Sequence, residues 1–479
     1  MVGTNDENIS VVKFFNSDPN GEIEFTGFIT SEHHLKNKRI SGLNIHNYHE
    51  FDHNPDKFGK IDGLVLLEGE GIDKKTDQLI DIFVNQKKEV FSSSLTRIHQ
   101  FKTKKSFQLK KIDFEDLLFR NPINIDEKRI NAIIRGKVVL VTGGGGSIGS
   151  ELVRQLCAYQ PDTIVIVDNA ETPLFFIEKE INDEFPDLHV IACLADVTNV
   201  SEMNLIFEQH KPFLVCHAAA YKHVTMMEKN PIKAFMVNVI GSKNIADLCI
   251  THQVRRMVMV STDKAVNPSC IMGLSKRLAE LYVQAKCREI ESSTGNKTNF
   301  IITRFGNVLG SNGSVIQIFR KQLRENKPLT VTHPEMTRYF MTIAEASKLV
   351  LQSAIDGISG NIYIFDMGEP VKILDMAKKL LRMNGLEPNV DVDIVFTGKK
   401  SGEKLHEELY YENCVTEQTT HPKIHRIMES QPDANAIISG FDQIRSAISA
   451  QNMDLIMVLS KSIVPEYVHE NERIETVRV

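Results

Sequence analysis

From about residue 125 onward, short apolar runs alternate with helix-length stretches that mix apolar and polar positions. The runs are rich in Val and Ile and are almost continuously apolar, which is typical of strands buried on both faces of a parallel sheet. Helices between such strands place them in one α/β domain. We therefore expect an α/β fold with a doubly wound, Rossmann-like parallel sheet. The predicted strands are KVVLVTG (137–143), TIVIVD (163–168), HVIACLAD (189–196), FLVCHAA (213–219), RMVMVST (256–262) and NFIITRF (299–305).

Residues 1–125 have a different pattern. EIEFTGFI (22–29), GLVLLEG (63–69) and DIFVNQ (81–86) are possible strands, whereas the charged stretch KKTDQLIDIFVNQKKE (74–89) also fits a helix. This region contains no glycine-rich phosphate loop, so we assign it no cofactor and expect a structural, regulatory or assembly role. The sequence predicts a small α/β domain here.

The length of 479 residues is about three times that of a typical domain. We expect the N-terminal domain over residues 1–125 and a second domain over residues 126–479. The core of the second domain is predicted at about 135–310 and a smaller substrate-binding part at about 311–479. The linker is expected within 113–136, where Asp126 is placed to cap a helix.

Composition and charge narrow the function classes. The chain has 56 Lys and Arg against 62 Asp and Glu, and a net charge of -6 gives no basic field for a nucleic acid. The seven cysteines form no Cys-x-x-Cys pair, which favours a reducing compartment over a disulfide or zinc framework. His421 and His425 have no acidic or cysteine partner beside them, so we expect no metal.

The chain also lacks the sequence signals of membrane insertion and export. No run approaches the roughly 18 apolar residues of a membrane span, and the polar start MVGTNDENIS is unlike a signal peptide. We expect a cytoplasmic location.

A glycine-rich loop follows the first strand of the predicted sheet. The segment TGGGGSIGSEL places Gly143, Gly146 and Gly149 between a strand and a helix, with Ser147 and Ile148 at the start of that helix. Glycines allow a tight turn and let the backbone approach a pyrophosphate, whose charge then lies at the helix N-terminus. The loop predicts a dinucleotide-binding site.

The next strands supply candidate contacts to the dinucleotide. Asp168 ends the second strand, where a carboxylate can accept hydrogen bonds from a ribose diol, and no arginine beside it is available for a 2′-phosphate. We therefore predict NAD rather than NADP. Asp196, followed by Val197, is placed to bind the adenine amino group, although an Asp there can also cap the next helix. Ala218 and Ala219 leave room for the cofactor.

Five segments together resemble the extended short-chain dehydrogenase/reductase superfamily: TGGGGSIGSEL, HAAAYKHVTMMEKNP, VSTDKAVNPSCIMGLSK, RFGNVLGSNGSVI and HPEMTRYFMTIAEA. More narrowly, the chain resembles the long bacterial UDP-N-acetylglucosamine 4,6-dehydratases of polysaccharide and protein-glycan synthesis that retain the C5 configuration. The resemblance covers about residues 113–468. It implies a UDP-sugar substrate, NAD, and a homo-oligomer. It also implies that a membrane anchor can precede the chain, which would place the protein at the inner face of the membrane.

The Tyr-x-x-x-Lys pair of most relatives is changed in this chain. Met272 stands at the tyrosine position, while Lys276 keeps the lysine. A thioether cannot exchange a proton, so either the chain is an inactive dehydrogenase or proton transfer has moved to other groups. The resembled branch carries the same Met, which favours an active enzyme. In that enzyme, Lys276 holds the nicotinamide ribose.

Thr262, Asp263 and Lys264 follow the fifth strand, at the sheet edge where α/β proteins bind ligands. The resemblance implies that Lys264 removes the C5 proton, Asp263 protonates the departing C6 hydroxyl and Thr262 binds the C4 oxygen. These tasks ask for a lowered Lys264 pKa and a raised Asp263 pKa, whereas an ion pair between them does the opposite. We therefore expect the bound sugar to separate the two. The alternative is a solvent-exposed pair without function.

The resemblance also suggests substrate contacts. Asn307 matches an asparagine that lies against the substrate diphosphate, and Arg338 is a candidate for a bidentate phosphate contact, although a surface ion pair is the alternative. Lys222 is expected near the nicotinamide side of the cleft. Lys400 and Ser401 replace the Arg-Pro that begins a family Arg-Pro-Gly-Glu-Lys stretch, so nucleotide preference is open.

Two other functions remain open from the sequence. A nucleotide-sugar 4-epimerase shares the cofactor and the fold, but Met272 and the Asp-Lys pair argue against it. A non-catalytic NAD-responsive module is conceivable because the tyrosine is lost and an extra domain is present. The retained Asp263, Lys264 and Lys276 argue against that module.

Overall fold

The computed structural model describes residues 1–17, 23–32, 35, 38–52, 61–67, 74–97, 105–112, 123–291, 298–411, 414–429 and 433–470. The chain divides into two compact units. The first comprises 1–123, 319–331 and 374–396, and the second comprises 124–318, 332–373 and 397–479. Each unit is described by itself.

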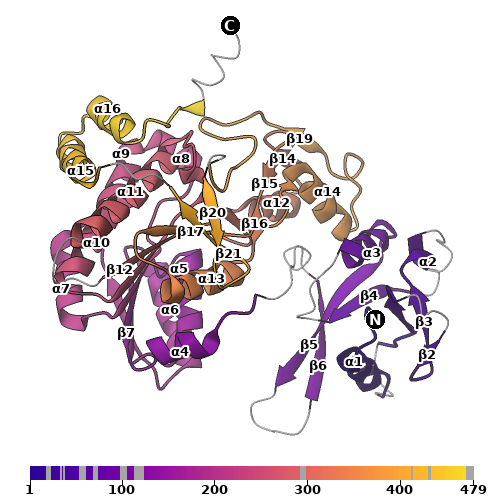
Figure 1. The fold of residues 1–479 in the computed structure, drawn as a ribbon. Helices are drawn as coiled ribbons and strands as arrows, with labels where there is room; N and C mark the ends of the chain where they lie inside the picture. Colours follow the sequence, from indigo (N-terminus) through magenta and orange to yellow (C-terminus); the bar gives the residue numbers. More distant parts are fainter. Residues whose placement is uncertain are drawn as a thin grey trace. The chain divides into compact units, whose positions relative to one another are not determined.

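The second unit is built on a nine-stranded sheet in the order β20-β21-β17-β12-β11-β10-β7-β8-β9 (Figure 1). The strands from β17 to β9 run parallel, and β20 and β21 add an antiparallel edge. The bounds are β7 (Val138–Thr142), β8 (Thr163–Asp168), β9 (His189–Leu194), β10 (Leu214–His217), β11 (Arg256–Val260), β12 (Asn299–Arg304), β17 (Asn361–Phe365), β20 (Val415–Gln418) and β21 (Ile424–Met428). All six predicted strands are present, and the predicted Rossmann-like sheet is confirmed. The strand order turns back between β7 and β10, which is where such sheets bind ligands.

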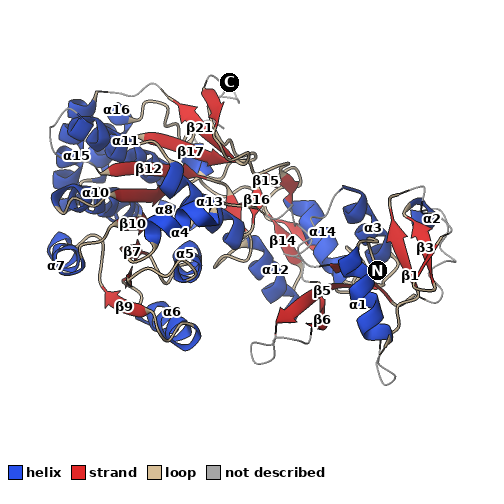
Figure 2. Cartoon of the chain, turned by 60° about the horizontal axis from the view of Figure 1, so that its bottom comes forward, coloured by secondary structure: helices blue, strands red, loops and turns tan. Residues whose placement is uncertain are grey.

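Helices pack in two sets on this sheet (Figures 1 and 2). One set packs around α13 and α5, and the other around α11 and α10. The first set is α4 (Glu127–Ile134), α5 (Ser147–Cys157), α6 (Glu171–Glu184) and α13 (Ile343–Asp356); the second is α7 (Val200–His210), α8 (Val224–Lys229), α9 (Pro231–Ala234), the π-helix η4 (Phe235–Gly241), α10 (Ser242–Thr251), α11 (Ile271–Glu291), α15 (Ala434–Ser449) and α16 (Met453–Ile463). The predicted cap of α4 is confirmed, because Asp126 accepts a hydrogen bond from the Arg129 backbone N–H.

Helix α11 is buried along most of its length, and ion pairs tie it to two strands. Arg304 on β12 is fully buried, and its guanidinium donates to both carboxylate oxygens of Glu280 on α11, at 2.7 and 2.6 Å. Arg304 also donates to Glu429, just beyond β21, at 2.8 Å, and Arg277 on α11 donates to the same carboxylate. These bonds fix the register between α11 and the sheet, and α11 carries two of the predicted site residues.

The first unit contains two small sheets. In one, β1 (Gly27–Thr30) runs parallel to β3 (Leu43–Asn47), which pairs antiparallel with β2 (Arg39–Ile40). In the other, β4 (Gly63–Leu67) runs parallel to β5 (Glu89–Arg97), which pairs antiparallel with β6 (Lys105–Lys111). The helices of this part are α1 (Asp6–Asn16), α2 (His49–Asp52) and α3 (Lys74–Asn85). The small α/β architecture predicted for the N-terminal region is confirmed.

Residues 81–86 are not a strand, which corrects one of the two alternatives left by the sequence. Residues 81–85 lie in α3, where Leu79, Ile80 and Phe83 form one buried face at helical spacing. The burial of this run follows the helical period. Of the predicted strand at 22–29, only the part from Gly27 onward is strand, and residue 22 lies outside the described residues.

The first unit also includes segments from later in the chain. These are most of α12 (Val315–Arg324), β14 (Leu329–Val331), nearly all of α14 (Ile373–Met383) and β19 (Ile394–Phe396), and β14 pairs with β19 in parallel. Lys379 on α14 forms ion pairs with Asp77 and Asp81 on α3, at 2.6 and 3.0 Å. Residues 113–122 of the predicted linker, 113–136, lie outside the described residues.

Candidate active site

The glycine-rich loop makes a tight turn between β7 and α5. Gly143 has φ +68°, and a Cβ atom on it would lie 2.6 Å from the Ala219 backbone nitrogen. A Cβ on Gly149 would lie 2.0 Å from the carbonyl oxygen of Gly143. Only glycine fits these two places, so the loop lies close against the 218–219 segment that follows β10. The predicted loop residues therefore meet at the turning point of the sheet.

The N-terminus of α5 faces this loop. Gly146 is its N-cap and provides no side-chain hydrogen bond, so the first-turn N–H groups can bind an anion. The Ser147 hydroxyl accepts a hydrogen bond from the Asn312 N–H at 3.1 Å, and Ile148 is half-buried beside it. The segment after Asn307 thus lies beside the glycine loop.

Asp168 lies beside the same loop. Its two carboxylate oxygens accept hydrogen bonds from the N–H groups of Gly145 and Ala170, at 2.8 and 2.9 Å. These bonds fix the carboxylate at the end of β8, and each oxygen keeps a lone pair for a further donor. The position is therefore suited to a ribose diol.

Asp196 follows β9 and accepts hydrogen bonds from the Thr198 N–H at 2.8 Å and from the Asn169 amide at 3.4 Å. Burial opposes its ionisation, but these hydrogen bonds outweigh it and hold the pKa of Asp196 below its usual value. The N-cap of α7 is Asn199, so Asp196 is not the helix cap that the sequence left open. Val197, next to it, is buried and accepts from Asn244 through its carbonyl.

A buried chain of polar groups, which the sequence analysis missed, connects the loop to α11. The hydroxyl of Thr142 and that of Ser242 lie 2.7 and 2.9 Å from the two ring nitrogens of His217, and Ser242 donates to the Asn238 carbonyl. The Asn238 amide donates to the Ser275 hydroxyl at 2.9 Å. Burial lowers the pKa of His217 to about 3, so the ring is neutral. These residues come from five separate elements, and no spacing along the chain indicates that they meet.

Lys276 and Met272 lie on the first turns of α11. The Lys276 ammonium is buried and donates to the Val260 carbonyl at the end of β11, at 2.7 Å. Burial lowers its pKa to about 8, although Glu280 acts in the opposite direction. Met272 is 3% exposed within the apolar core, and Ser275 donates to its carbonyl. The structure therefore brings the lysine to the strand end, while position 272 offers no group for proton transfer.

Asp263 and Lys264 form an ion pair directly after β11, in a single turn of 3-10 helix (Asp263–Ala265) capped by Thr262. The Lys264 ammonium donates to Asp263 Oδ1 at 2.9 Å, and the Thr262 hydroxyl donates to the same oxygen at 2.9 Å. The Asp263 side chain is 0% exposed, so the alternative of a solvent-exposed pair is wrong. Asp263 Oδ2 is buried and has no hydrogen-bond partner among the described residues.

The pKa of Lys264 is shifted in the direction opposite to the one that its proposed catalytic role requires. Burial alone would lower its pKa, but the carboxylates of Asp263 and Glu407 outweigh burial and raise the pKa of Lys264 above its usual value. The sequence predicted a lowered pKa for the catalytic state. In this structure the ion pair is closed, which produces the opposite shift.

Glu407 is a site residue that the sequence analysis missed. Its Oε1 lies 3.5 Å from the Lys264 ammonium and 3.8 Å from Arg338 Nε, and its side chain is 2% exposed. It lies in an irregular segment more than a hundred residues beyond Lys264, so no strand or helix pattern points to it. Its place within KLHEEL, three residues after the Lys404 that matches the family stretch, was the one available signal.

Two of the three predicted substrate-contact residues lie beside the cluster of Asp263, Lys264 and Glu407. The Asn307 amide oxygen accepts from the Lys264 ammonium at 3.3 Å. Arg338 is 6% exposed, which excludes a surface ion pair, and its guanidinium donates to the carbonyls of Thr337, Lys404 and Leu405. Lys222 is exposed beyond β10 and is not part of the cluster. Phosphate binding by these residues stays a prediction.

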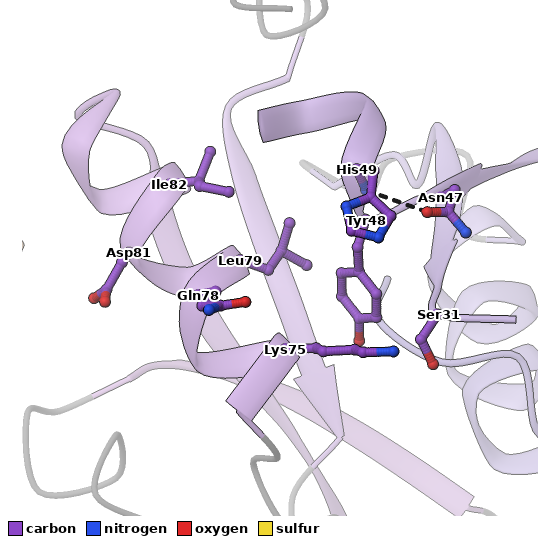
Figure 3. Close-up of a pocket in the computed structure, with 9 residues that line it drawn as sticks. All are labelled: Ser31, Asn47, Tyr48, His49, Lys75, Gln78, Leu79, Asp81 and Ile82. Atoms are coloured by element: carbon purple, nitrogen blue, oxygen red, sulfur yellow. Dashed lines mark hydrogen bonds between the residues drawn. The ribbon is translucent and has the colours of Figure 1, made fainter. Parts of the chain in front are cut away.

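A separate cavity of about 290 Å³ lies in the first unit (Figure 3). It adjoins the carboxyl ends of the parallel strands β1 and β3, and α3 forms its opposite wall. Its lining residues are Ser31, Asn47, Tyr48, His49, Lys75, Gln78, Leu79, Asp81 and Ile82. None of the site residues predicted from the sequence lines this cavity.

Two features are absent from the part of the chain that the structure describes. No group of three or more His, Cys, Asp and Glu side chains is placed to hold a metal ion there. Among the described helices, none combines the length and the apolar character needed to cross a membrane.

The chain has relatives among proteins of known family. Residues 139–429 match a family described as polysaccharide biosynthesis protein. The capsular polysaccharide biosynthesis protein CapD of Staphylococcus aureus is 44% identical over 319 residues, which are 66% of this chain and 52% of CapD. The chain thus spans about half the length of the curated relatives it matches.

More distant relatives carry enzyme names. The UDP-N-acetylglucosamine 4,6-dehydratase (inverting) of Campylobacter jejuni is 33% identical over 279 residues, covering 57% of this chain and 78% of that protein. A UDP-glucose 4-epimerase of Rickettsia canadensis is equally similar, at 33% over 279 residues, 57% of this chain and 77% of the epimerase.

Among solved structures, Pen from Bacillus thuringiensis is 27% identical, with a TM-score of 0.57 over 63% of this chain and 91% of Pen. The family match extends from β7 to the end of β21 and thus across the whole Rossmann-like sheet. The resemblance to extended short-chain dehydrogenase/reductases is confirmed, and the chain belongs to the polysaccharide biosynthesis protein family.

Proposed function

We propose that this protein is an NAD-dependent nucleotide-sugar 4,6-dehydratase that acts on UDP-N-acetylglucosamine for surface polysaccharide or glycan synthesis. The product is the UDP-4-keto-6-deoxy sugar with the C5 configuration retained. In this reaction C4 is oxidised, water is eliminated across C5 and C6, and C6 is reduced. The sugar undergoes no net oxidation, because it is oxidised at C4 and reduced at C6.

One observation carries this proposal. Asp263 and Lys264 form a buried pair at the carboxyl end of β11, where Lys276 also donates to the Val260 carbonyl, while Met272 occupies the position of the usual tyrosine. A plain dehydrogenase needs an acid–base group at position 272. A dehydratase needs a separate acid and base for C5 and C6, and the pair supplies both.

The residues around the glycine loop fit NAD. Gly143 and Gly149 occupy places that any Cβ would fill, the N-terminus of α5 is suited to the pyrophosphate, and Asp168 is suited to the adenosine ribose. Asp196 and Val197 would border the adenine, and Ala218 and Ala219 would leave space beside the loop. NAD bound there supplies the acceptor and donor of the hydride.

The acid and base roles follow from the pair. When the hexose lies between Asp263 and Lys264, one of the two charges that raise the pKa of Lys264 moves away, which favours the neutral amine that takes the C5 proton. Asp263 takes the C4 hydroxyl proton when the hydride leaves C4, and it later gives this proton to the departing C6 hydroxyl. Thr262 turns its hydroxyl hydrogen from Asp263 to the C4 oxygen, and the Lys276 ammonium holds the nicotinamide ribose.

The nucleotide-sugar contacts belong to the same proposal. Asn307 lies beside the pair, where its amide N–H groups can reach a diphosphate while its oxygen holds Lys264. Lys222 is exposed beyond β10 and can approach the ligand as a point charge. Arg338 keeps its phosphate role only if the ligand displaces one of its carbonyl partners.

A 4-epimerase is the second candidate. It is favoured by the Rickettsia canadensis UDP-glucose 4-epimerase, which is as similar to this chain as the Campylobacter jejuni dehydratase. An epimerase oxidises C4 and returns the hydride to C4, and it needs no acid at C6. The buried Asp263 argues for the dehydratase.

Product analysis tests the proposal. Purified protein, catalytic NAD and UDP-N-acetylglucosamine should yield a product that has lost one water and carries a C4 ketone, detected by mass spectrometry. NMR should show the retained configuration at C5. An unchanged mass with an inverted C4 supports the epimerase, an inverted C5 contradicts the retaining branch, and NAD binding without turnover of UDP, dTDP and GDP sugars supports a non-catalytic module.

The assembly and location complete the proposal. We expect a homo-oligomer in the cytoplasm, or at the inner face of the membrane if an anchor precedes this chain in the native protein. Light scattering that returns a monomer contradicts the first expectation. Recovery of the native protein from the soluble fraction alone contradicts the anchor.

A further inference from the structure

Lys264 has two carboxylates within reach. Its ammonium donates to Asp263 Oδ1 at 2.9 Å and lies 3.5 Å from Glu407 Oε1. Both acids are buried, and each has a second oxygen without a hydrogen-bond partner among the described residues. One lysine therefore lies between two acids, of which the proposed reaction uses only one.

The segment that carries Glu407 is anchored by hydrogen bonds just before that residue. The Arg338 guanidinium donates to the carbonyls of Lys404 and Leu405 at 2.9 and 3.1 Å. The Lys404 ammonium donates to the Val266 carbonyl, directly after the turn that holds Asp263 and Lys264, at 3.0 Å. These bonds fix the backbone just before Glu407, so its carboxylate is aimed at Lys264 by the fold.

The two acids have different duties in the proposed reaction. Asp263 must leave Lys264 and carry a proton to the C6 oxygen, and the ammonium that forms when Lys264 takes the C5 proton is costly to bury without a partner. We propose that Glu407 is a positioning residue for this reaction, which holds the Lys264 side chain in the site while the sugar separates it from Asp263. This inference rests on the proposed function and adds a residue to it.

The electrostatics of the cluster agree with this role. Asp263 and Glu407 raise the pKa of Lys264, and Arg338 lowers it. Cys270 also faces Lys264 and Glu407, but burial raises the pKa of its thiol to about 12, so it stays neutral. Tyr339 faces Asp263, and burial raises its pKa as well. Asp263 and Glu407 are therefore the acids that act on Lys264.

Competitive acylation of Lys264 tests the contact without any substrate. The neutral amine is acylated by acetic anhydride, and mass spectrometry of the Lys264 peptide across pH gives the midpoint of labelling. Glu407→Gln should lower this midpoint by about one pH unit or more, because an opposite charge at this distance shifts a pKa by roughly that amount. Glu408→Gln is the matched control, since Glu408 is the next residue and pairs with Lys404 instead.

The Asp263→Asn background reproduces the loss of the first acid. Here Glu407 is the remaining carboxylate on Lys264, so the midpoint should lie about one unit or more above that of the Asp263→Asn/Glu407→Gln double variant. Equal midpoints in the single and double variants overturn the proposal. If Glu407→Gln does not fold, Glu407→Asp replaces it and should give a smaller shift in the same direction.

Turnover provides the second readout. In Glu407→Gln the limb of kcat that rises with pH should move to lower pH, the plateau should fall at least tenfold, and KM should change less than threefold, with Glu407→Asp restoring part of the loss. A uniform loss at every pH, without movement of the limb, indicates a merely structural residue and overturns the proposal. If the wild type makes no 4-keto sugar, the proposed function fails, while labelling still decides whether Glu407 holds Lys264.

Discussion

At the scale of single residues, two lysines near the end of β11 have opposite surroundings. Lys264 lies between two carboxylates, and its pKa is raised because they outweigh burial. Lys276 donates to a carbonyl, and burial lowers its pKa to about 8. Lys264 is therefore held as an ammonium by two acids, while Lys276 titrates close to physiological pH.

The lowered pKa of Lys276 predicts a pH-dependent stability. Between pH 8 and about 10.5 the unfolded chain binds this proton more tightly than the folded protein, so stability from this group rises with pH and is absent below pH 8. Relative to Lys276→Met, the wild type should gain about 2–3 kcal/mol in unfolding free energy across this window. Urea unfolding at pH 8 and 10.5 measures it. The control is Lys179→Met, which removes an exposed lysine. If the wild type gains no more unfolding free energy relative to Lys276→Met than it gains relative to Lys179→Met, burial of Lys276 does not cause the effect.

Removing either member of the buried pair should abolish turnover. Asp263→Asn and Lys264→Met should each lower kcat by about 10² or more, since positioned acids and bases contribute 10²- to 10⁴-fold. NAD binding should stay within about threefold of wild type, because neither side chain contacts the glycine loop. Initial rates and fluorescence titration with NAD measure the two effects. Wild-type turnover in both variants rules out the proposed chemistry.

The site residues that lie at the end of a strand, or directly after one, could be predicted from the sequence. The glycine loop, Asp168 and the Thr262–Lys264 turn each follow a strand, and the strands are visible in the sequence. Glu407, His217 and Asn238 were not predictable, because their partners come from distant elements. The sequence indicated that an ion pair with Asp263 raises the pKa of Lys264, but it did not indicate the second cause, Glu407.

At the scale of elements, the turn between β7 and α5 and the anchoring of α11 hold the site together. The turn requires glycine for both φ and space, whereas α11 is held to β12 by a buried Arg304–Glu280 pair. Each feature can be tested by one substitution, and the chain offers a matched control substitution for each.

Gly143→Ala tests the turn against Gly136→Ala. Both glycines have φ +68°, so both substitutions cost about 1–2 kcal/mol of backbone strain. A Cβ at Gly136 meets no described atom within 4 Å, whereas one at Gly143 lies 2.6 Å from the Ala219 nitrogen. Only Gly143→Ala should lose NAD affinity, by about tenfold or more, as measured by fluorescence titration. Equal NAD affinity in the two variants would contradict the close approach.

Arg304→Met tests the anchoring of α11. It leaves Glu280 buried without its main counter-charge and should cost about 3–5 kcal/mol of unfolding free energy. The control is Arg426→Met, which removes a more exposed pair with Glu417 and should cost about 0–1 kcal/mol. Denaturant unfolding of both variants measures the difference. Similar losses would show that the Arg304 pairs do not stabilise the fold.

The main elements of the second unit were predictable because the strands of a doubly wound sheet are continuous apolar runs. The strands β17, β20 and β21 were not among the six predicted strands. Of these, Val415–Gln418 is exposed and mostly polar, so no apolar run marks it. In the first unit, α3 was left undecided because a short apolar run has no clear period.

At the scale of the whole molecule, the active-site candidates all lie in the second unit, and the first unit contributes none of them. The first unit takes residues 319–331 and 374–396 from the later chain, segments that the sequence assigned to a substrate-binding part. Sequence patterns could not show this grouping, because it depends on contacts between segments about three hundred residues apart.

The central claim is that hydride leaves the sugar at C4 and returns at C6 of the same molecule. The most direct measurement uses UDP-N-acetylglucosamine deuterated at C4, with wild-type protein and catalytic NAD, and locates the deuterium by NMR. We expect a 4-keto product with deuterium at C6 and, in ordinary water, a solvent-derived proton at C5. Deuterium that remains at C4 of an unchanged or epimerised sugar would contradict it.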